Sequence, residues 1–345
     1  MSPPPFSHRN KKTKDLSYYL NGLAESNTFV LAEVITLIES TREDHQVLAS
    51  TILTNLFEQN PKTESLRIAI TGSPGAGKST FIDYFGCSLL QKGHKVAVLT
   101  IDPSSNSSRG SILGDKTRME QLSVSEGAYI RPTASGNLLG GIAAHTKETI
   151  LLCEAAGFDR IIIETVGVGQ NETEVSYITD INLFILQPGA GDDLQGIKRG
   201  VLENIDIAVV NKSDGDMKYL AVETVRHYTQ SLAFFRHALQ NWHIPVYQIS
   251  SLEKRGVEQV LQSLDFFENE SKKQGLFYVK RKEQELKWFE KQIPSLFWEW
   301  VMAKTSFKES VETLKKDIEN KQLNGVLAVR LYKNLIENFD WSKNG

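Results

Sequence analysis

The chain has 345 residues, of which 40% are hydrophobic and 23% charged, and its formal net charge is −3 at pH 7. These values are ordinary for a globular protein, and the length predicts one large domain with appended segments, or two domains. The charge argues against a nucleic-acid surface held by bulk electrostatics, and no run approaches the roughly 18 to 20 apolar residues of a membrane helix. Cys87 and Cys153 form no disulfide framework or metal-ligand spacing, which favours a reducing compartment.

Residues 1–14, MSPPPFSHRNKKTK, are basic and rich in proline. They contain no apolar core, so they are not typical of a secretory signal. We expect a disordered tail here, with an organelle-targeting segment as the weaker alternative. From residue 15 to residue 60, apolar residues recur at steps of three and four. This spacing predicts an N-terminal extension of two helices, parted by the polar stretch from Ser40 to Asp44 and packed on the next domain.

Between residues 61 and 270, short apolar strands alternate with helical stretches. This alternation predicts an α/β domain with a mostly parallel sheet flanked by helices on both faces. In such sheets ligands bind at the carboxyl ends of the strands. The expected strands span residues 66–70, 95–101, 128–131, 160–164, 181–187, 206–210 and 246–249. The expected helices include residues 78–91, 141–156, 193–203, 217–240 and 256–270.

Residues 271–345 form the last region, which is rich in charged residues and helical in pattern. An apolar stripe runs along its first helix, and it is too rich in large side chains for a solitary surface helix. The stripe consists of Trp288, Phe289, Leu296, Phe297 and Trp300. We expect this helical region to pack against a second subunit, with packing on the preceding domain as the alternative.

A phosphate-binding loop is indicated by LRIAITGSPGAGKSTF, residues 66–81. It combines an apolar strand, the pattern G-x-x-x-x-G-K-[ST] and a helix, which is the context that the pattern requires. Backbone N–H groups and the positive end of the helix dipole would face the phosphates. Lys78 is expected to reach the β and γ phosphates, and Ser79 to bind Mg²⁺. The candidate loop residues are Gly72, Ser73, Pro74, Gly75, Ala76, Gly77, Lys78, Ser79 and Thr80.

Two acidic residues stand at the ends of neighbouring predicted strands. Asp102 closes VAVLTI, and Glu164 closes RIIIE. With Ser79 they are the candidate magnesium ligands, because the metal must bridge phosphate oxygens and neutralise charge; the alternative is an ordinary strand-end surface charge. The N–H of Gly167 is placed to sense the γ-phosphate. The next residue is Val168 rather than the glutamine that orients water in efficient GTPases, so we expect slow intrinsic turnover.

The string AVVNKSD predicts which base is bound. Asp214 can accept both donors of the guanine edge, N1–H and the exocyclic amine, whereas adenine would leave a buried carboxylate unpaired. Asn211 can tie this loop to the phosphate loop, and the stem of Lys212 can lie on the base. Ser250 and Ser251 follow another strand, where a backbone N–H would meet the guanine oxygen. The sequence therefore favours GTP and GDP over adenine nucleotides.

The segment QPGAGDDLQGIKR, residues 187–199, adds glycines, acids and bases beside the expected nucleotide. It has two equally supported interpretations from spacing alone. One is a functional loop, and the other is an ordinary strand-to-helix connection capped by Asp192 or Asp193.

The chain resembles the MeaB/ArgK family of P-loop GTPases. The strings that carry the resemblance are TGSPGAGKST, IDPSSNSSRGSILGDKTRM, RPTASGNLLGG, IIIETVGVGQNETEV, QPGAGDDLQGIKRG and VVNKSD, which span residues 71–214 in the family's order. The resemblance implies a G domain with a C-terminal helical dimerisation arm. It also implies Asp102 and Asp115 in a first switch, Glu164 in a second, and residues 187–199 as a third, with Asp192 and Lys198 coupling to a partner. The implied catalytic residues are Lys78, Asp102, Asp115, Glu164 and Lys198.

The resemblance further implies a homodimeric G-protein chaperone of adenosylcobalamin-dependent acyl-CoA mutases. Such a chaperone gates cofactor loading and protects or reactivates the mutase. We expect a cytoplasmic location, or the mitochondrial matrix in a eukaryote, and no nucleic-acid or membrane partner. The sequence departs mildly from the family pattern at residues 106–109 and at Asn171. These are loop positions, so the departures bear on timing and partner choice more than on nucleotide binding.

Three other functions are alternatives to this one. A metallochaperone GTPase for metalloenzyme maturation needs Cys or His ligands near the switches, where Cys87, Cys153 and His145 stand isolated. A transport-linked ATPase or kinase conflicts with Asp214 and with the lack of a membrane segment. A nucleotide-binding module without turnover differs from a GTPase only in phosphate release.

Overall fold

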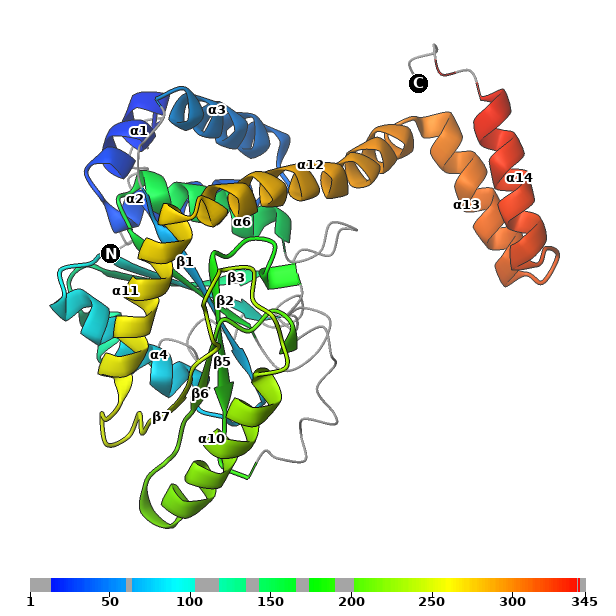
Figure 1. Cartoon of the computed structure of the whole chain (residues 1–345). Coiled ribbons are helices and arrows are strands. Elements are labelled where there is room, and N and C mark those ends of the chain that lie inside the picture. Colours follow the sequence, from blue (N-terminus) through cyan, green and yellow to red (C-terminus); the bar gives the residue numbers. More distant parts are fainter. Residues whose placement is uncertain are drawn as a thin grey trace, which may run out of the picture. The chain divides into compact units, whose positions relative to one another are not determined.

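The computed structural model describes residues 14–59, 64–102, 118–134, 143–165, 174–189, 202–339 and 341. In this part of the chain, seven parallel strands form one sheet in the order β3-β2-β4-β1-β5-β6-β7 (Figure 1). The α/β class and the parallel sheet predicted from the sequence are confirmed. The strands are β1 (Leu66–Gly72), β2 (Val96–Asp102), β3 (Ala128–Ala134), β4 (Arg160–Thr165), β5 (Ile181–Leu186), β6 (Ile207–Val210) and β7 (Val246–Gln248).

Both faces of the sheet are covered by helices, which explains why its strands are apolar at consecutive positions. On one face, Ile68 and Ile70 of β1 share a core with α4 (Lys78–Gln91) and α11 (Val257–Lys273). On the other face, Ala69 of the same strand packs in a core with α6 (Ala143–Ala155), and α10 (Lys218–Leu232) covers β5 and β6. The alternating directions of successive side chains therefore supply two cores from one strand.

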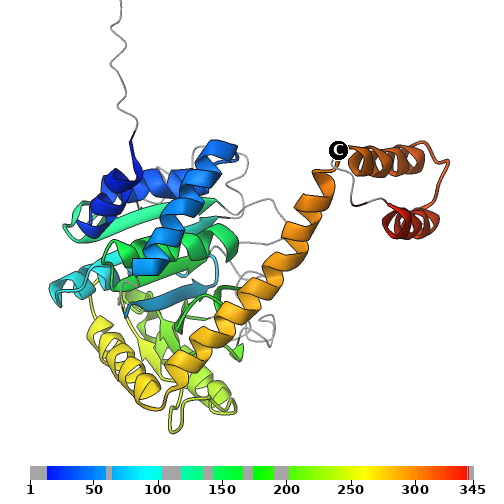
Figure 2. The same ribbon diagram turned by 90° about the horizontal axis from the view of Figure 1, so that it is seen from above.

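The N-terminal region contains three helices among the described residues, not the two that were predicted. They are α1 (Leu16–Ala24), α2 (Thr28–Ile38) and α3 (Glu43–Gln59). The helical conformation is interrupted between α1 and α2 at Ser26, which has a φ of 58°. Asn27 then caps α2, because its side chain accepts hydrogen bonds from Phe29 N (3.0 Å) and Val30 N (3.3 Å). All three helices pack with α6 in one core, as Figure 2 shows from above.

Helix α10 is shorter than predicted and ends at Leu232 rather than near Gln240. Beyond the end of the helix, His237 contacts Asp206, the residue before β6. Its Nε2 lies 2.6 Å from Asp206 Oδ1, and its Nδ1 accepts a hydrogen bond from Leu239 N at 2.9 Å. The predicted helix at residues 193–203 lies almost wholly outside the described residues.

The C-terminal helices are α12 (Leu276–Met302), α13 (Thr305–Glu319) and α14 (Gly325–Asn338). The chain divides into two compact units, one reaching Glu285 and the other beginning at Leu286. The second unit has its own small core, formed by Val301, Phe307 and Val311 with aromatic neighbours such as Tyr332. No helix within the described residues combines the length and apolarity needed to cross a bilayer.

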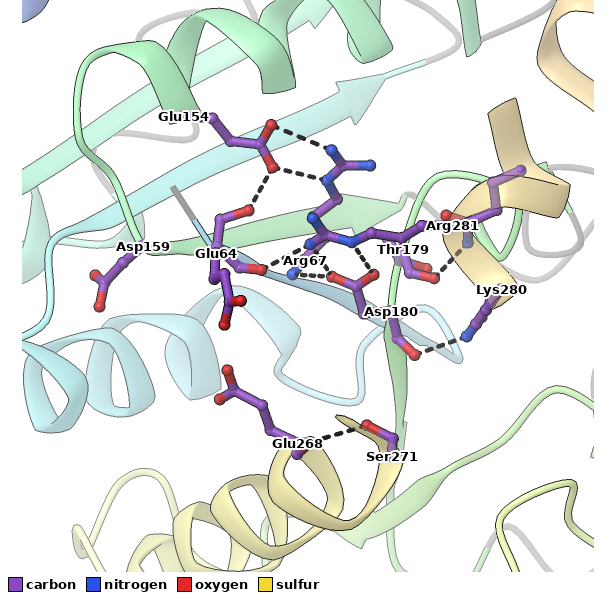
Figure 3. A network of polar contacts seen from close by, with 12 residues as sticks. Glu64, Arg67, Glu154, Asp159, Thr179, Asp180, Glu268, Ser271, Lys280 and Arg281 are labelled. Atoms are coloured by element: carbon purple, nitrogen blue, oxygen red, sulfur yellow. Dashed lines mark hydrogen bonds and ion pairs between the residues drawn. The ribbon is translucent and has the colours of Figure 1, made fainter. Parts of the chain in front are cut away.

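Buried ion pairs hold the amino edge of the sheet together (Figure 3). Arg67 of β1 makes two parallel bonds to Glu154 of α6, Nε to Oε1 at 3.0 Å and Nη2 to Oε2 at 3.1 Å. Arg281 of α12 also makes two bonds to Asp180, Nε to Oδ1 at 2.8 Å and Nη2 to Oδ2 at 2.7 Å. Lys280 donates to the carbonyl of Asp180 at 2.7 Å, and the N–H of Arg67 donates to its carboxylate at 2.8 Å. These contacts fasten the first turns of α12 to β1 and β5.

We expect Glu154→Gln to lower the free energy of unfolding by about 3 kcal/mol, because it leaves the buried charge of Arg67 without a counter-charge. The measurement is urea denaturation at pH 7. Asp265→Asn is the matched control, since it removes the carboxylate of the exposed Lys92–Asp265 pair. It should cost less than about 1 kcal/mol. Equal losses in the two variants would contradict this assignment.

Candidate nucleotide-binding site

The carboxyl edge of the sheet brings the phosphate-loop residues beside the end of β4. In the parallel register Ile70 of β1 lies opposite Glu164 of β4. Beyond β1 the chain turns through Gly75 and Gly77, whose φ angles are 78° and 84°, and α4 begins at Lys78. A Cβ on Gly77 would lie 2.7 Å from Asn211 Nδ2, so a larger residue is excluded by both the backbone conformation and this contact. The loop therefore has the form that an anion-binding turn requires.

The two polar side chains at the start of α4 contact different partners. Lys78 Nζ donates to the carbonyls of Gly72 (2.9 Å) and Ser73 (3.2 Å). Ser79 Oγ donates to Glu164 Oε1 at 3.0 Å, although the two residues are far apart in sequence. This contact places a hydroxyl and a carboxylate side by side at the helix N-terminus. Two oxygen donors are the chemistry that Mg²⁺ prefers, so the residues fit such an ion.

Several predicted site residues cannot be placed in the same way. The backbone of Asp102 ends β2, which pairs with β4. Asp115, Gly167 and Lys198 lie outside the described residues. Among the described residues, no group of three or more His, Cys, Asp and Glu side chains could hold a metal ion.

Asn211 joins the phosphate loop to the loop that follows β7. Its Nδ2 donates to the carbonyls of Ala76 (3.0 Å) and Gly77 (3.3 Å). Its Oδ1 accepts from both Ser251 N (3.1 Å) and Ser251 Oγ (2.9 Å). The side chain is buried, so these bonds are protected from water. The N–H of Ser251, expected at the guanine oxygen, is thus bonded to Asn211 in this structure.

Asp214 is held by a hydroxyl from the same loop. Ser250 Oγ donates to Asp214 Oδ2 at 2.5 Å, which fixes the orientation of the carboxylate. Between Asn211 and Asp214, the exposed Lys212 adopts a φ of 57°, and Ser213 N donates to Ile249 O at 3.1 Å. The N-K-x-D residues and the serine pair therefore form one hydrogen-bonded unit.

Two residues that donate hydrogen bonds to the backbone of this unit and its neighbouring turn were not predicted from the sequence. Arg255 Nη2 donates to the carbonyl of Ser213 at 2.8 Å, and Tyr84 of α4 donates to the carbonyl of Lys254 at 2.7 Å. The sequence does contain one indication of a tight turn here, which is Gly256 directly after Lys254 and Arg255. Gly256 has a φ of 91° in the structure. Nothing in the sequence connects that turn to Tyr84.

A parallel sheet with a phosphate loop after β1 and N-K-x-D after β6 defines the class of P-loop GTPases. A profile of the family described as "Methylmalonyl Co-A mutase-associated GTPase MeaB" matches residues 31–306, and the chain belongs to this family. The fold is similar to the solved "Crystal structure of LAO/AO transport system kinase", with a TM-score of 0.72 and 32% identity. That likeness covers 94% of this chain and 98% of the other.

Curated relatives agree with this assignment over most of their length. A "Putative GTPase" of Caulobacter vibrioides is 44% identical, covering 87% of this chain and 88% of the relative. "GTPase ArgK" of Escherichia coli is 38% identical over 93% of this chain and 97% of its own. "Methylmalonic aciduria type A homolog, mitochondrial" of Mus musculus is 38% identical, over 92% of this chain and 78% of the relative. The family resemblance seen in the motifs is therefore confirmed.

Proposed function

We propose that this protein binds and hydrolyses GTP and acts as a chaperone of an adenosylcobalamin-dependent acyl-CoA mutase. In this role it gates cofactor loading and protects or reactivates the mutase, which is methylmalonyl-CoA mutase or a relative. The observation that carries the nucleotide assignment is the bonding of Asn211 to the phosphate loop, which sets the guanine motif against the phosphate site. The description of the family and the name of the mouse relative support the mutase as partner.

The bound nucleotide would contact the chain at both ends. Lys78 and the N–H groups at the start of α4 hold the phosphates, and Asp214, oriented by Ser250, accepts the two donors of guanine. Mg²⁺ would be held through Ser79, Glu164 and Asp102, and it would neutralise charge on the phosphate oxygens. Ser79 and Glu164 already lie within hydrogen-bond distance of one another, which supports this donor set.

Coupling to the mutase is assigned to the segment from residue 187 to residue 199. Its described start is tied to α10, because Gly189 N donates to Thr224 Oγ1 at 3.0 Å. Asp192 and Lys198 carry the coupling in this proposal, and Asp115 and Gly167 respond to the γ-phosphate. Helix α10 begins soon after the guanine motif, so this segment and the base loop share a neighbour.

The second compact unit carries the proposed homodimer contact. Its part of α12 exposes large apolar side chains at the three- and four-residue steps of a heptad seam. These are Leu286, Phe289, Ile293, Leu296 and Trp300, each about half exposed or more. A single helix leaves such a seam in water, whereas a second copy of the same helix would cover it.

We assign the protein to the cytoplasm, or to the mitochondrial matrix if its source is eukaryotic. The Escherichia coli and mitochondrial mouse relatives fit these two locations.

For the nucleotide, we expect calorimetry to show GDP bound at least about 100-fold more tightly than ADP, because adenine leaves Asp214 without its donors. Lys78→Ala should weaken GTP binding at least about tenfold through the lost phosphate contact. Lys92→Ala, at the other end of the same helix, is the control. Equal binding of GDP and ADP would contradict the assignment, and so would undiminished GTP binding by the Lys78 variant.

The rate of intrinsic GTP hydrolysis should stay below about one per second. A turnover of tens per second would contradict this expectation.

For the partner, we expect a cobalamin-dependent mutase to be retained on the full chain loaded with a nonhydrolysable GTP analogue. The analogue holds the state in which the switches contact the γ-phosphate. Adding the purified mutase should raise the rate of phosphate release several-fold. Lys78→Ala is the matched control and should give neither result. Absence of both effects with the wild-type chain would refute the mutase role while leaving nucleotide binding intact.

For the dimer, we expect the double variant Phe289→Glu/Leu296→Glu to sediment as a monomer, because charges in an apolar seam cannot be buried unpaired. The control variant Phe57→Glu/Phe234→Glu changes two other exposed phenylalanines, which lie outside the seam. This control should sediment like the wild type. A dimeric seam variant, or a monomeric control, would show that the contact lies elsewhere.

A further inference from the structure

The loop that orients Asp214 is closed by backbone hydrogen bonds. Ser250 N donates to Arg255 O at 3.0 Å, and Arg255 N donates to Ser250 O at 2.9 Å, so the turn from Ser251 to Lys254 is held at its base. Ser250 Oγ accepts from Glu253 N at 3.0 Å and donates to Asp214 Oδ2. The direction of that hydroxyl is therefore set by the shape of the turn.

The far side of the turn contains a strained residue. Lys254 has a φ of 50°, a left-handed conformation that residues with a Cβ adopt rarely. Such a conformation persists where the surrounding structure holds it in place. Here the carbonyl of Lys254 accepts a hydrogen bond from Tyr84 Oη at 2.7 Å, and its Nζ donates to Gln121 Oε1 at 2.9 Å. Both ends of this residue are fixed by elements outside the loop.

Tyr84 is a dependable donor for this bond. It is half-buried on α4, the helix that begins at Lys78. Its hydroxyl has two acceptors within hydrogen-bond distance, the carbonyl of Lys254 at 2.7 Å and Glu258 Oε1 at 3.3 Å, and the contact with Lys254 is the shorter one. Burial, followed by the charge of Glu258, raises the pKa of Tyr84 above its ordinary value, so the hydroxyl stays protonated at physiological pH.

We propose that Tyr84 is a positioning residue for guanine selectivity. It acts through the carbonyl of Lys254 and the turn to place Ser250, and Ser250 in turn places the carboxylate of Asp214. This inference rests on the proposed binding of guanine nucleotides. It adds that the helix which holds the phosphates also sets the geometry of base recognition.

The physical basis is that Asp214 must meet two donors at once. A carboxylate accepts the guanine N1–H and the exocyclic amine together only in one orientation. Without the Tyr84 bond, the strained Lys254 is free to relax and Ser250 shifts with the turn. Inosine nucleotides lack the exocyclic amine, so they depend less on the orientation of the carboxylate. The ratio of GDP affinity to IDP affinity therefore reports how well Asp214 is placed.

The test is the GDP-to-IDP affinity ratio of Tyr84→Phe, measured by calorimetry on the full chain with Mg²⁺. We expect the ratio to fall about three- to tenfold, the scale of one hydrogen bond, mainly through weaker GDP binding. Tyr247→Phe is the matched control. It removes a hydroxyl that bonds to Ser263 between β7 and α11, away from the turn. Its ratio should stay within twofold of the wild type.

Thermal unfolding of both variants without nucleotide separates stability from selectivity. If Tyr84→Phe keeps the wild-type ratio, or if Tyr247→Phe changes the ratio equally, the positioning role is overturned. If Tyr84→Phe fails to fold, Lys254→Pro tests the same turn, since proline cannot adopt the positive φ; an unchanged ratio in that variant overturns the role. Equal binding of GDP and ADP by the wild type would instead refute the proposed function itself.

Discussion

The candidate nucleotide site depends on the side-chain amide of Asn211, which is hydrogen-bonded to two loops at once. An asparagine has two donor hydrogens and an oxygen with two lone pairs. Here both donors meet phosphate-loop carbonyls and both lone pairs meet Ser251, so the capacity of the group is fully used. A carboxylate would repel the carbonyls, and an apolar residue would leave buried backbone groups unpaired. The base loop and the phosphate loop are thus positioned as one body.

The two edges of the sheet have different roles: the amino edge contains stabilising ion pairs, and the carboxyl edge contains the candidate site. At the amino edge, buried charges meet opposite charges, as in Arg67 with Glu154 and Arg281 with Asp180. At the carboxyl edge, Ser79 Oγ donates to Glu164 Oε1, so a hydroxyl and a carboxylate lie together. In the proposed function, a triphosphate and its metal bind at this carboxyl edge, whereas the charges of the amino edge are paired with one another. The topology favours the same edge, because ligands bind at the carboxyl ends of the strands in open parallel sheets.

Local patterns predicted the sheet because each strand is an apolar run between breakers, and α4 was predicted with its observed bounds. The break between α1 and α2 was missed, although Asn27 is a residue typical of a helix cap. The early end of α10 was missed, and the contact of His237 with Asp206 beyond it joins residues distant in sequence, which periodicity does not encode. In the candidate site, the motifs supplied Ser79, Asn211 and Asp214. The supporting hydrogen bonds, such as that of Tyr84 with Lys254, join residues that are distant in sequence and belong to no motif. They can therefore be identified only in the folded chain.

Helix α4 contacts both parts of the candidate nucleotide site. Its first turn carries Lys78 and Ser79, and further along the same side of the domain Tyr84 bonds to the base loop. The same helix therefore begins with phosphate-loop residues and donates a hydrogen bond to the turn that follows β7. Asn211 supplies a second connection, because its amide bonds both to the carbonyls of Ala76 and Gly77 and to Ser251 N.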